Sequence, residues 1–136
     1  MDESRQTETV TVNATIEHAQ FWLSTAGQPH PASDGLIPDH FSDRIASDGI
    51  AVAVPTVEQW ADIEVTMTLY SSRYEEAGAQ YLGESTLEVI DAGLRCVDFH
   101  GTPFPWLPLR GIAHCTLSVW RMPGNKEAYK ICVFPS

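Results

Sequence analysis

The sequence predicts an all-β protein, namely an antiparallel β-sandwich of about seven or eight strands with at most one short helix. Three observations indicate this fold class: short segments alternate apolar and polar residues, turn sequences recur roughly every ten residues, and no longer repeat is visible. A small closed barrel is the alternative architecture. With 136 residues the chain has the length of one domain. We therefore expect a single domain over residues 1–136, with residues 1–7 flexible.

The N-terminal half contains three expected strand regions. Residues 9–23 carry β-branched side chains in alternation and end in an apolar patch at 21–23. Residues 49–54 are apolar on both faces, which indicates a strand covered on both sides. Residues 62–72 alternate with a period of two, as a half-buried antiparallel strand does. The inward-facing residues of that strand are expected to be Ile63, Val65, Met67 and Leu69.

The C-terminal half contains two expected hairpins. Residues 81–91 and 94–100 are joined by an Asp-Ala-Gly sequence, which predicts a hairpin turn. Residues 112–122 and 128–135 flank the sequence Pro-Gly-Asn-Lys, a strong turn signal that predicts a second hairpin. Helix is scarce in this pattern. Residues 40–48 suit a short helical turn, and residues 57–63 could start another, although we interpret them as a loop that enters a strand.

Charge is distributed unevenly along the chain. Residues 1–98 contain seventeen acidic residues and four arginines, a net charge of −13, whereas residues 99–136 contain four basic residues and one glutamate, a net charge of +3. Affinity for nucleic acid comes mostly from Lys and Arg that displace counterions. The overall charge of −10 therefore argues against a nucleic-acid partner and favours a basic protein. The alternative is that the acidic surface serves solubility alone.

Several features favour a cytoplasmic protein. No run of eighteen apolar residues occurs, so we expect no membrane span. The N-terminus is acidic and polar, whereas a secretory signal is basic and then apolar. Cys96, Cys115 and Cys132 are odd in number, lie in apolar runs and form no CxxC pair. We therefore expect buried, reduced thiols.

Two loops stand apart from the predicted strands. The first, residues 24–43, is long and rich in Pro, Gly, Asp and His, and loops of this length are usually functional or mobile. The second, residues 100–111, places three prolines among Phe104, Trp106 and two leucines. Prolines stiffen a loop, so displaying these aromatics to a partner costs little ordering entropy. The alternative is that the second loop caps one end of the sandwich and buries its own aromatics.

Residue types that support catalysis or metal binding do not converge into a known pattern. The metal-ligand candidates lie in the first loop: His30, Asp34, Asp39 and His40. Their spacing matches no zinc-finger or metalloprotease motif, and a polar surface loop accounts for them. Neighbours His114 and Cys115 point to opposite faces of a regular strand, and glycine-rich phosphate loops and GxSxG elbows are absent. We therefore expect no catalytic residue, metal or cofactor. The alternative hypothesis is a metal- or small-ligand-binding enzyme that uses residues 30–43.

A protein-binding module is the better hypothesis. An inhibitor or immunity-like partner of a basic enzyme, such as a nuclease, needs carboxylates that pair with the Lys and Arg of the enzyme, plus one or two aromatic anchors. The partner-binding candidates are four acidic residues that we place at outward strand positions, Glu64, Glu84, Glu88 and Asp98, together with Phe104 and Trp106 of the second loop. A homodimer is a further hypothesis, because Trp22, Trp60 and Trp120 on sheet faces would create an apolar surface. The basic C-terminal part would then meet the acidic body of a second copy.

The order of these features resembles the small β-sandwich proteins of the competence protein J type. The matching pieces are residues 18–21, 43–54, 69–75 and 117–124. The most specific parts are the Asp48-Gly49 pair and the strand with Trp120 before a proline turn. The resemblance implies a β-sandwich that inhibits a DNA-entry nuclease of competent bacteria. The loop sequences PHPASDGLIPDH and FPWLP have no counterpart in that family, and no functional residue is carried over.

Overall fold

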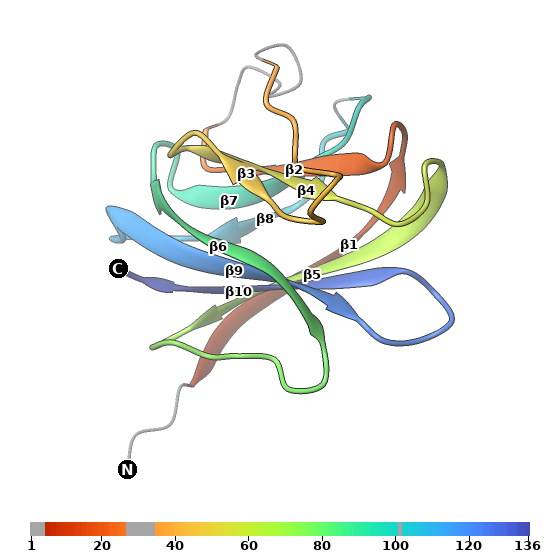
Figure 1. The fold of residues 1–136 in the computed structure, drawn as a ribbon. Coiled ribbons are helices and arrows are strands. Elements are labelled where there is room, and N and C mark those ends of the chain that lie inside the picture. Colours follow the sequence, from red (N-terminus) through yellow and green to blue (C-terminus); the bar gives the residue numbers. More distant parts are fainter. Residues whose placement is uncertain (1–4, 27–34, 101) are drawn as a thin grey trace.

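The computed structural model describes residues 5–26, 35–100 and 102–136, and this part of the chain contains ten strands and no helix. The strands form two five-stranded sheets that pack face to face (Figure 1). Sheet A contains β1 (Gln6–Ile16), β5 (Ala61–Tyr70), β10 (Ala128–Pro135), β9 (His114–Met122) and β6 (Gln80–Glu88), in this spatial order. Sheet B contains β3 (Ala46–Ser47), β4 (Ala51–Pro55), β2 (Gln20–Ser24), β7 (Gly93–Val97) and β8 (Trp106–Pro108), again in spatial order. The predicted all-β sandwich is confirmed.

The structure has more strands than the sequence led us to expect. Two of the ten, β3 and β8, span only two and three residues. A strand this short shows no alternation that a sequence pattern can detect. Both lie in segments that we had interpreted as a helical turn or a loop. Residues 40–43 form a non-helical turn, closed by backbone hydrogen bonds between Asp39 and Arg44.

Sheet A is mixed, whereas we expected antiparallel pairing throughout. The C-terminal strand β10 pairs antiparallel with β9 and parallel with β5, between which it lies. Ile131, Cys132 and Val133 of β10 are fully buried. A strand that is covered on both faces reads as a continuous apolar run, so its sequence carries no sign of which neighbour it joins.

One predicted hairpin is confirmed and the other is wrong. The strands β9 and β10 form the hairpin expected around the Pro-Gly-Asn-Lys turn. At the Asp-Ala-Gly turn the chain instead crosses between sheets, since β6 pairs with β9 in sheet A and β7 pairs with β2 and β8 in sheet B. Leu87 before the turn and Leu94 after it are both fully buried. Each fills the core from its own sheet, which local alternation does not distinguish from a hairpin.

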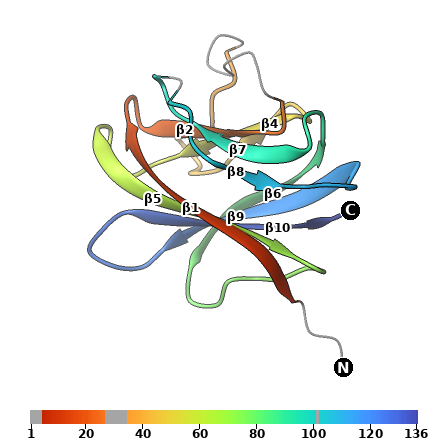
Figure 2. The same cartoon turned by 180° about the vertical axis from the view of Figure 1, so that it is seen from behind.

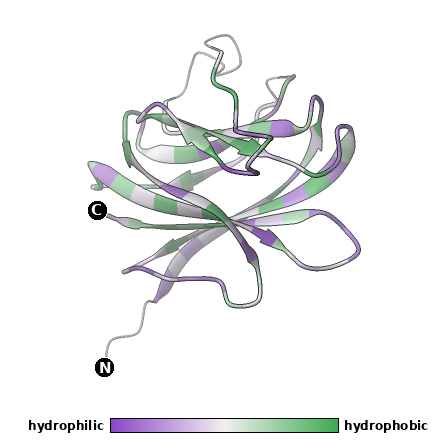
Figure 3. Cartoon of the chain, viewed as in Figure 1, coloured by the Kyte–Doolittle hydropathy of each residue, from purple (hydrophilic) through white to green (hydrophobic). Residues whose placement is uncertain are grey.

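The core lies between the two sheets. Bands of hydrophobic and hydrophilic residues alternate along several strands (Figure 3), and the inward-facing residues of both sheets form one cluster. Phe21 of sheet B meets Tyr129 of sheet A edge to face, at 5.3 Å between ring centroids. Val65 is fully buried as predicted, but Leu69 is only partly buried. The pairing of β1 with β5 shifts register opposite Leu69, which moves that side chain to the edge of the core.

The three cysteines are free and buried, as predicted. Burial raises the pKa of Cys115 and of Cys132 to about 11, and it also raises the pKa of Cys96. Because the thiolate is the reactive form, these thiols are inert at neutral pH. Within the described residues no helix is long and apolar enough to cross a membrane.

Candidate protein-binding surface

Five large apolar side chains are exposed on segments that connect strands at one end of the sandwich. We call this set the end patch, and it comprises Ile37, Phe41, Val57, Trp60 and Phe99. Their exposed fractions range from 42% for Phe99 to 102% for Phe41. The β1–β2 turn, the segment between β4 and β5 and the segment after β7 lie at this end in both views (Figures 1 and 2). Exposed apolar patches on soluble proteins commonly mark interaction sites.

His18 joins the aromatic members of the end patch. Its ring centroid lies 5.3 Å from that of Trp60 and 4.8 Å from that of Phe99. A hollow of ≈ 380 Å³ beside these rings is lined by His18, Ala19, His40, Val57 and Gln59. The surface therefore combines exposed aromatic rings with a shallow depression beside them.

The β1–β2 turn holds His18 in an unusual backbone conformation. His18 and Ala19 have φ values of 62° and 61°, the left-handed region that both central residues of a type I′ turn require and that Asn-Gly adopts most easily. The Ala19 N–H donates to the Gln59 carbonyl at 3.1 Å, and the Thr56 N–H donates to the Ala19 carbonyl at 2.9 Å. The turn is thus attached to the segment that carries Trp60.

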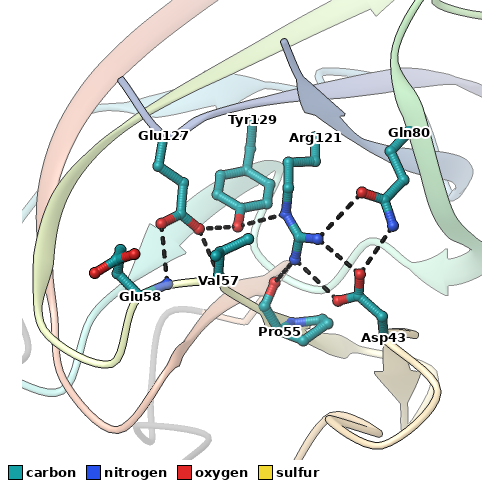
Figure 4. Close-up of polar contacts among 8 residues, drawn as sticks. All are labelled: Asp43, Pro55, Val57, Glu58, Gln80, Arg121, Glu127 and Tyr129. Carbon is teal, nitrogen blue, oxygen red and sulfur yellow. Dashed lines mark hydrogen bonds and ion pairs between the residues drawn. The ribbon is translucent and has the colours of Figure 1, made fainter. Parts of the chain in front are cut away.

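A largely buried guanidinium fixes two of the segments that carry the end patch. Arg121 on β9 donates two hydrogen bonds to the Asp43 carboxylate, at 2.7 and 3.0 Å, and one to the Pro55 carbonyl at 2.9 Å (Figure 4). Only 11% of the Arg121 side chain is exposed. Because these bonds hold residues 39–44 and 55–60, Arg121 positions the loops of the end patch.

Glu127, after the β9–β10 turn, extends this support. Its carboxylate accepts the backbone N–H groups of Val57 at 2.8 Å and Glu58 at 3.2 Å. The Tyr129 hydroxyl donates to the same carboxylate and accepts a hydrogen bond from Arg121 Nε at 3.0 Å. The guanidinium and the two carboxylates therefore belong to one continuous network beneath the patch (Figure 4).

The network keeps its charges at neutral pH. Hydrogen bonds from Arg121 hold the pKa of Asp43 below its ordinary value of 3.8. Burial raises the pKa of Tyr129, and the bond to Glu127 raises it further, so the hydroxyl stays protonated as the donor. Burial lowers the pKa of Arg121, but hydrogen bonds to Asp43 and Tyr129 outweigh this effect and raise it overall.

Three of the four predicted acidic candidates lie on the outer face of sheet A. Glu64 is half-buried on β5, whereas Glu84 and Glu88 are exposed on the edge strand β6. The strand register places Glu64 three strands and four positions away from Glu84, which corresponds to roughly 20 Å. Glu84 also forms a two-bond ion pair with Arg73, at 2.6 and 3.0 Å. These acids share a face without forming a compact cluster.

The fourth acidic candidate, Asp98, does not point outward. Only 2% of Asp98 is exposed, and Asp98 falls on the same side of the chain as the buried Leu94 and Cys96 of β7. The carboxylate accepts hydrogen bonds from the His100 N–H at 3.0 Å and from the N–H and hydroxyl of Thr102 at 2.9 and 2.6 Å. Asp98 therefore shapes the turn after β7, and the prediction of an outward position is wrong.

The proline-rich second loop is partly strand. β8 pairs with β7, and the leucines at 107 and 109 are fully buried. Phe104 is half-buried against the core, whereas Trp106 is 44% exposed, with the Arg95 guanidinium 4.6 Å from its ring centroid. The leucines of this loop enter the core and Phe104 packs against it, but Trp106 remains exposed, so the alternative that the loop buries its own aromatics holds only for Phe104.

The metal-ligand candidates do not gather into a site in the described residues. His30 and Asp34 lie outside those residues. Asp39 accepts a hydrogen bond within its own turn at 3.0 Å, and His40 Nε2 lies 3.0 Å from Gln20 Oε1. Within the described ranges, no three His, Cys, Asp or Glu side chains are grouped so as to hold a metal ion.

Sequence reasoning missed the end patch. We had considered Trp60 as a sheet-face residue and Phe41 as part of a helical turn, but both lie on segments that connect strands. Phe41, Val57 and Trp60 each have polar neighbours and follow no strand or helix period. A large apolar residue that belongs to no strand or helix pattern is not directed into the core. This feature of the sequence could have indicated the end patch.

The strand order of the two sheets defines a β-sandwich, and comparison with solved structures shows that its fold is that of competence protein J. The resemblance stated from the sequence is thereby confirmed at the level of the fold. ComJ from Bacillus subtilis, described as an inhibitor of the DNA-degrading activity of NucA, matches with a TM-score of 0.70 and 12% identity. The match covers 99% of this chain and 100% of ComJ.

A second solved structure has the same fold. It is described as crocagin biosynthetic gene J and matches with a TM-score of 0.66 and 11% identity, over 95% of this chain and 97% of its own. No protein-family model matches the chain, and no curated protein matches its sequence. At these identities the likeness shows a shared fold, and function is argued separately below.

Proposed function

We propose that this chain is a protein-binding module that inhibits a basic enzyme, with a nuclease as the first candidate. The observation that carries the proposal is the match of the whole fold to ComJ, which inhibits the DNA-degrading activity of NucA. The net charge of −10 supports a basic partner, because opposite charges steer two proteins into encounter.

Inhibition by binding requires a contact surface and a charge that competes with the substrate. Carboxylates and DNA phosphates are both ligands for the Lys and Arg of a nuclease, so an acidic protein bound at those cations excludes DNA. The exposed aromatic side chains add contact area of the kind that dominates binding energy in protein interfaces. A cytoplasmic location fits the free, buried thiols and remains part of the proposal.

The test is capture of the enzyme followed by an activity assay. The immobilised protein is incubated with extract of the organism that produces it and washed at low and then high salt. A column that carries an unrelated protein of equal net charge is the control for ion exchange. We expect the high-salt eluate of the first column alone to degrade DNA, and one equivalent of added protein to suppress that degradation. An eluate without nuclease activity, or activity that survives excess protein, contradicts the proposal.

A further inference from the structure

We propose that the end patch is the surface that docks the basic enzyme, with His18 as its central contact. This inference rests on the proposed function, since it takes that enzyme as the occupant. It differs from the sequence-based choice of site, which placed the contacts on the acidic outer face of sheet A and on the loop with Trp106.

The first argument is the nature of the exposed residues. Trp22 and Trp120 are at least 92% buried, whereas Trp60 is 58% exposed and is the most exposed of the four tryptophans. Phe41, on the segment between β2 and β3, is completely exposed. Tryptophan is the residue most enriched among interface hot spots, and its exposure in the unbound protein has no stabilising role.

The second argument is that the patch is held in place before any partner binds. Arg121 fixes the segment with Phe41 through Asp43, and Glu127 fixes the segment with Trp60 through two backbone N–H groups. A surface that is already ordered loses little conformational entropy on binding. Buried polar networks are costly to assemble, so their position under these particular loops indicates that loop geometry matters.

The third argument comes from the turn that carries His18. Both central residues occupy the left-handed region, yet the sequence there is His-Ala in place of the favoured Asn-Gly. The His18 ring packs on Trp60 and Phe99, at the surface, and is not part of the core cluster. The turn therefore departs from the favoured sequence at an exposed position and gains no core packing from it. Such a departure is expected where a side chain has a binding role.

The fourth argument is charge. The exposed charged residues on segments 35–44 and 56–62 are Asp39, Arg44, Glu58 and Asp62, and the exposed Lys126 lies beside Val57 and Glu58. These five residues have a net charge of −1. A second copy of the chain would present the same negative rim, so like charges oppose self-association through this surface. In the C-terminal part, Arg121 and Lys130 are already paired with Asp43 and Glu76. A partner with a basic rim around an apolar centre is the occupant that fits.

The experiment measures affinity for the enzyme captured in the preceding test. The patch variants are Phe41→Ala, Trp60→Ala and His18→Asn. Two matched controls are Trp106→Ala and Ile90→Ala, each of which removes an exposed apolar side chain outside the end patch. We expect each patch variant to bind at least 10-fold more weakly, and both controls to bind within 2-fold of wild type. As a separate check of the turn, His18→Asn and Ala19→Gly should keep or raise the thermal unfolding midpoint, because asparagine and glycine adopt the left-handed conformation more easily than histidine and alanine do.

The possible outcomes separate the two proposals. If wild type inhibits the enzyme and the patch variants bind as tightly as wild type, the docking surface is wrong and the inhibitor function stands. If wild type does not bind any nuclease, both proposals fail. Sedimentation of the protein alone tests whether a second copy of the chain occupies the patch. A dimer that Trp60→Ala and Phe41→Ala abolish would assign the patch to a second copy and overturn the proposal that it docks a basic enzyme.

Discussion

Replacing Arg121 with methionine tests whether the buried network supports the end patch. Methionine keeps the apolar stem that packs beside β10 but removes all hydrogen bonds to Asp43, Pro55 and Tyr129. We expect a large loss of stability, because the change leaves acceptors without donors in a site that is mostly closed to water.

The magnitude follows from the exposure of each partner. The Pro55 carbonyl is buried and loses its donor, which costs about 1–2 kcal/mol. The Tyr129 hydroxyl loses one bond, about 1 kcal/mol. Asp43 is 38% exposed, so water screens its lost ion pair and that contribution is about 1 kcal/mol or less. The total is about 3 kcal/mol, at the lower end of what breaking a buried pair costs.

The assay is urea unfolding followed by tryptophan fluorescence and far-ultraviolet circular dichroism. With a denaturant slope of about 2 kcal/mol per molar, the midpoint should fall by roughly 1.5 M. Arg73→Met is the matched control: its ion pair with Glu84 is exposed and screened by water, so we expect a much smaller loss than for Arg121→Met. A loss for Arg121→Met as small as that of the control would refute the structural role of the network.

Three further predictions concern stability. The pKa of Asp43 is lowered in the folded state, so its pairing with Arg121 stabilises the fold above pH 3.8, and this stabilisation is lost as the pH falls below that value. The difference in unfolding free energy between wild type and Arg121→Met should therefore become smaller on acidification. A difference that stays constant from pH 7 to pH 2 contradicts this prediction. Gly124→Val should cost about 1–3 kcal/mol in thermal unfolding, since φ is +139° there and open space around the glycine leaves strain as the sole cause; an unchanged midpoint would count against it. Val65→Ala should lower the free energy of unfolding by about 2–3 kcal/mol and Leu69→Ala by about 1 kcal/mol, because Val65 is fully buried and Leu69 only partly. A larger loss for Leu69→Ala, which removes more atoms, would show that the burial is misassigned.

The sequence indicated the strands that have one wet face or a strong turn. Residues 62–72 alternate because the outer face of β5 meets solvent, and the Pro-Gly-Asn-Lys turn marks the β9–β10 hairpin. It did not indicate sheet membership. The Asp-Ala-Gly turn connects two strands that both alternate, and nothing local distinguishes a hairpin from a crossing between sheets. The parallel pairing of β10 is equally hidden, because a strand buried on both faces has no preferred side.

The candidate site was predicted less well, and for a physical reason. Alternation identifies exposed carboxylates such as Glu84 and Glu88. It also places Asp98 on the side of the buried Leu94 and Cys96, which the prediction of an outward Asp98 overlooked. The end patch is assembled from three connecting segments that are distant in sequence, and His18 contacts it from a fourth. The contacts that bring them together are long-range, such as Arg121 to Asp43, and no sequence period encodes them.

The most direct test of the account is fluorine NMR of protein labelled with 5-fluorotryptophan, recorded with and without the captured enzyme. The chain has four tryptophans, two buried and two exposed, and Trp60→Phe and Trp106→Phe variants assign the exposed pair. Since the enzyme is unlabelled, each resonance reports one position on this protein. We predict that the Trp60 resonance shifts or broadens on binding while that of Trp106 stays in place. A change at Trp106 with none at Trp60 would place the interface at the loop that carries Trp106 and contradict the account.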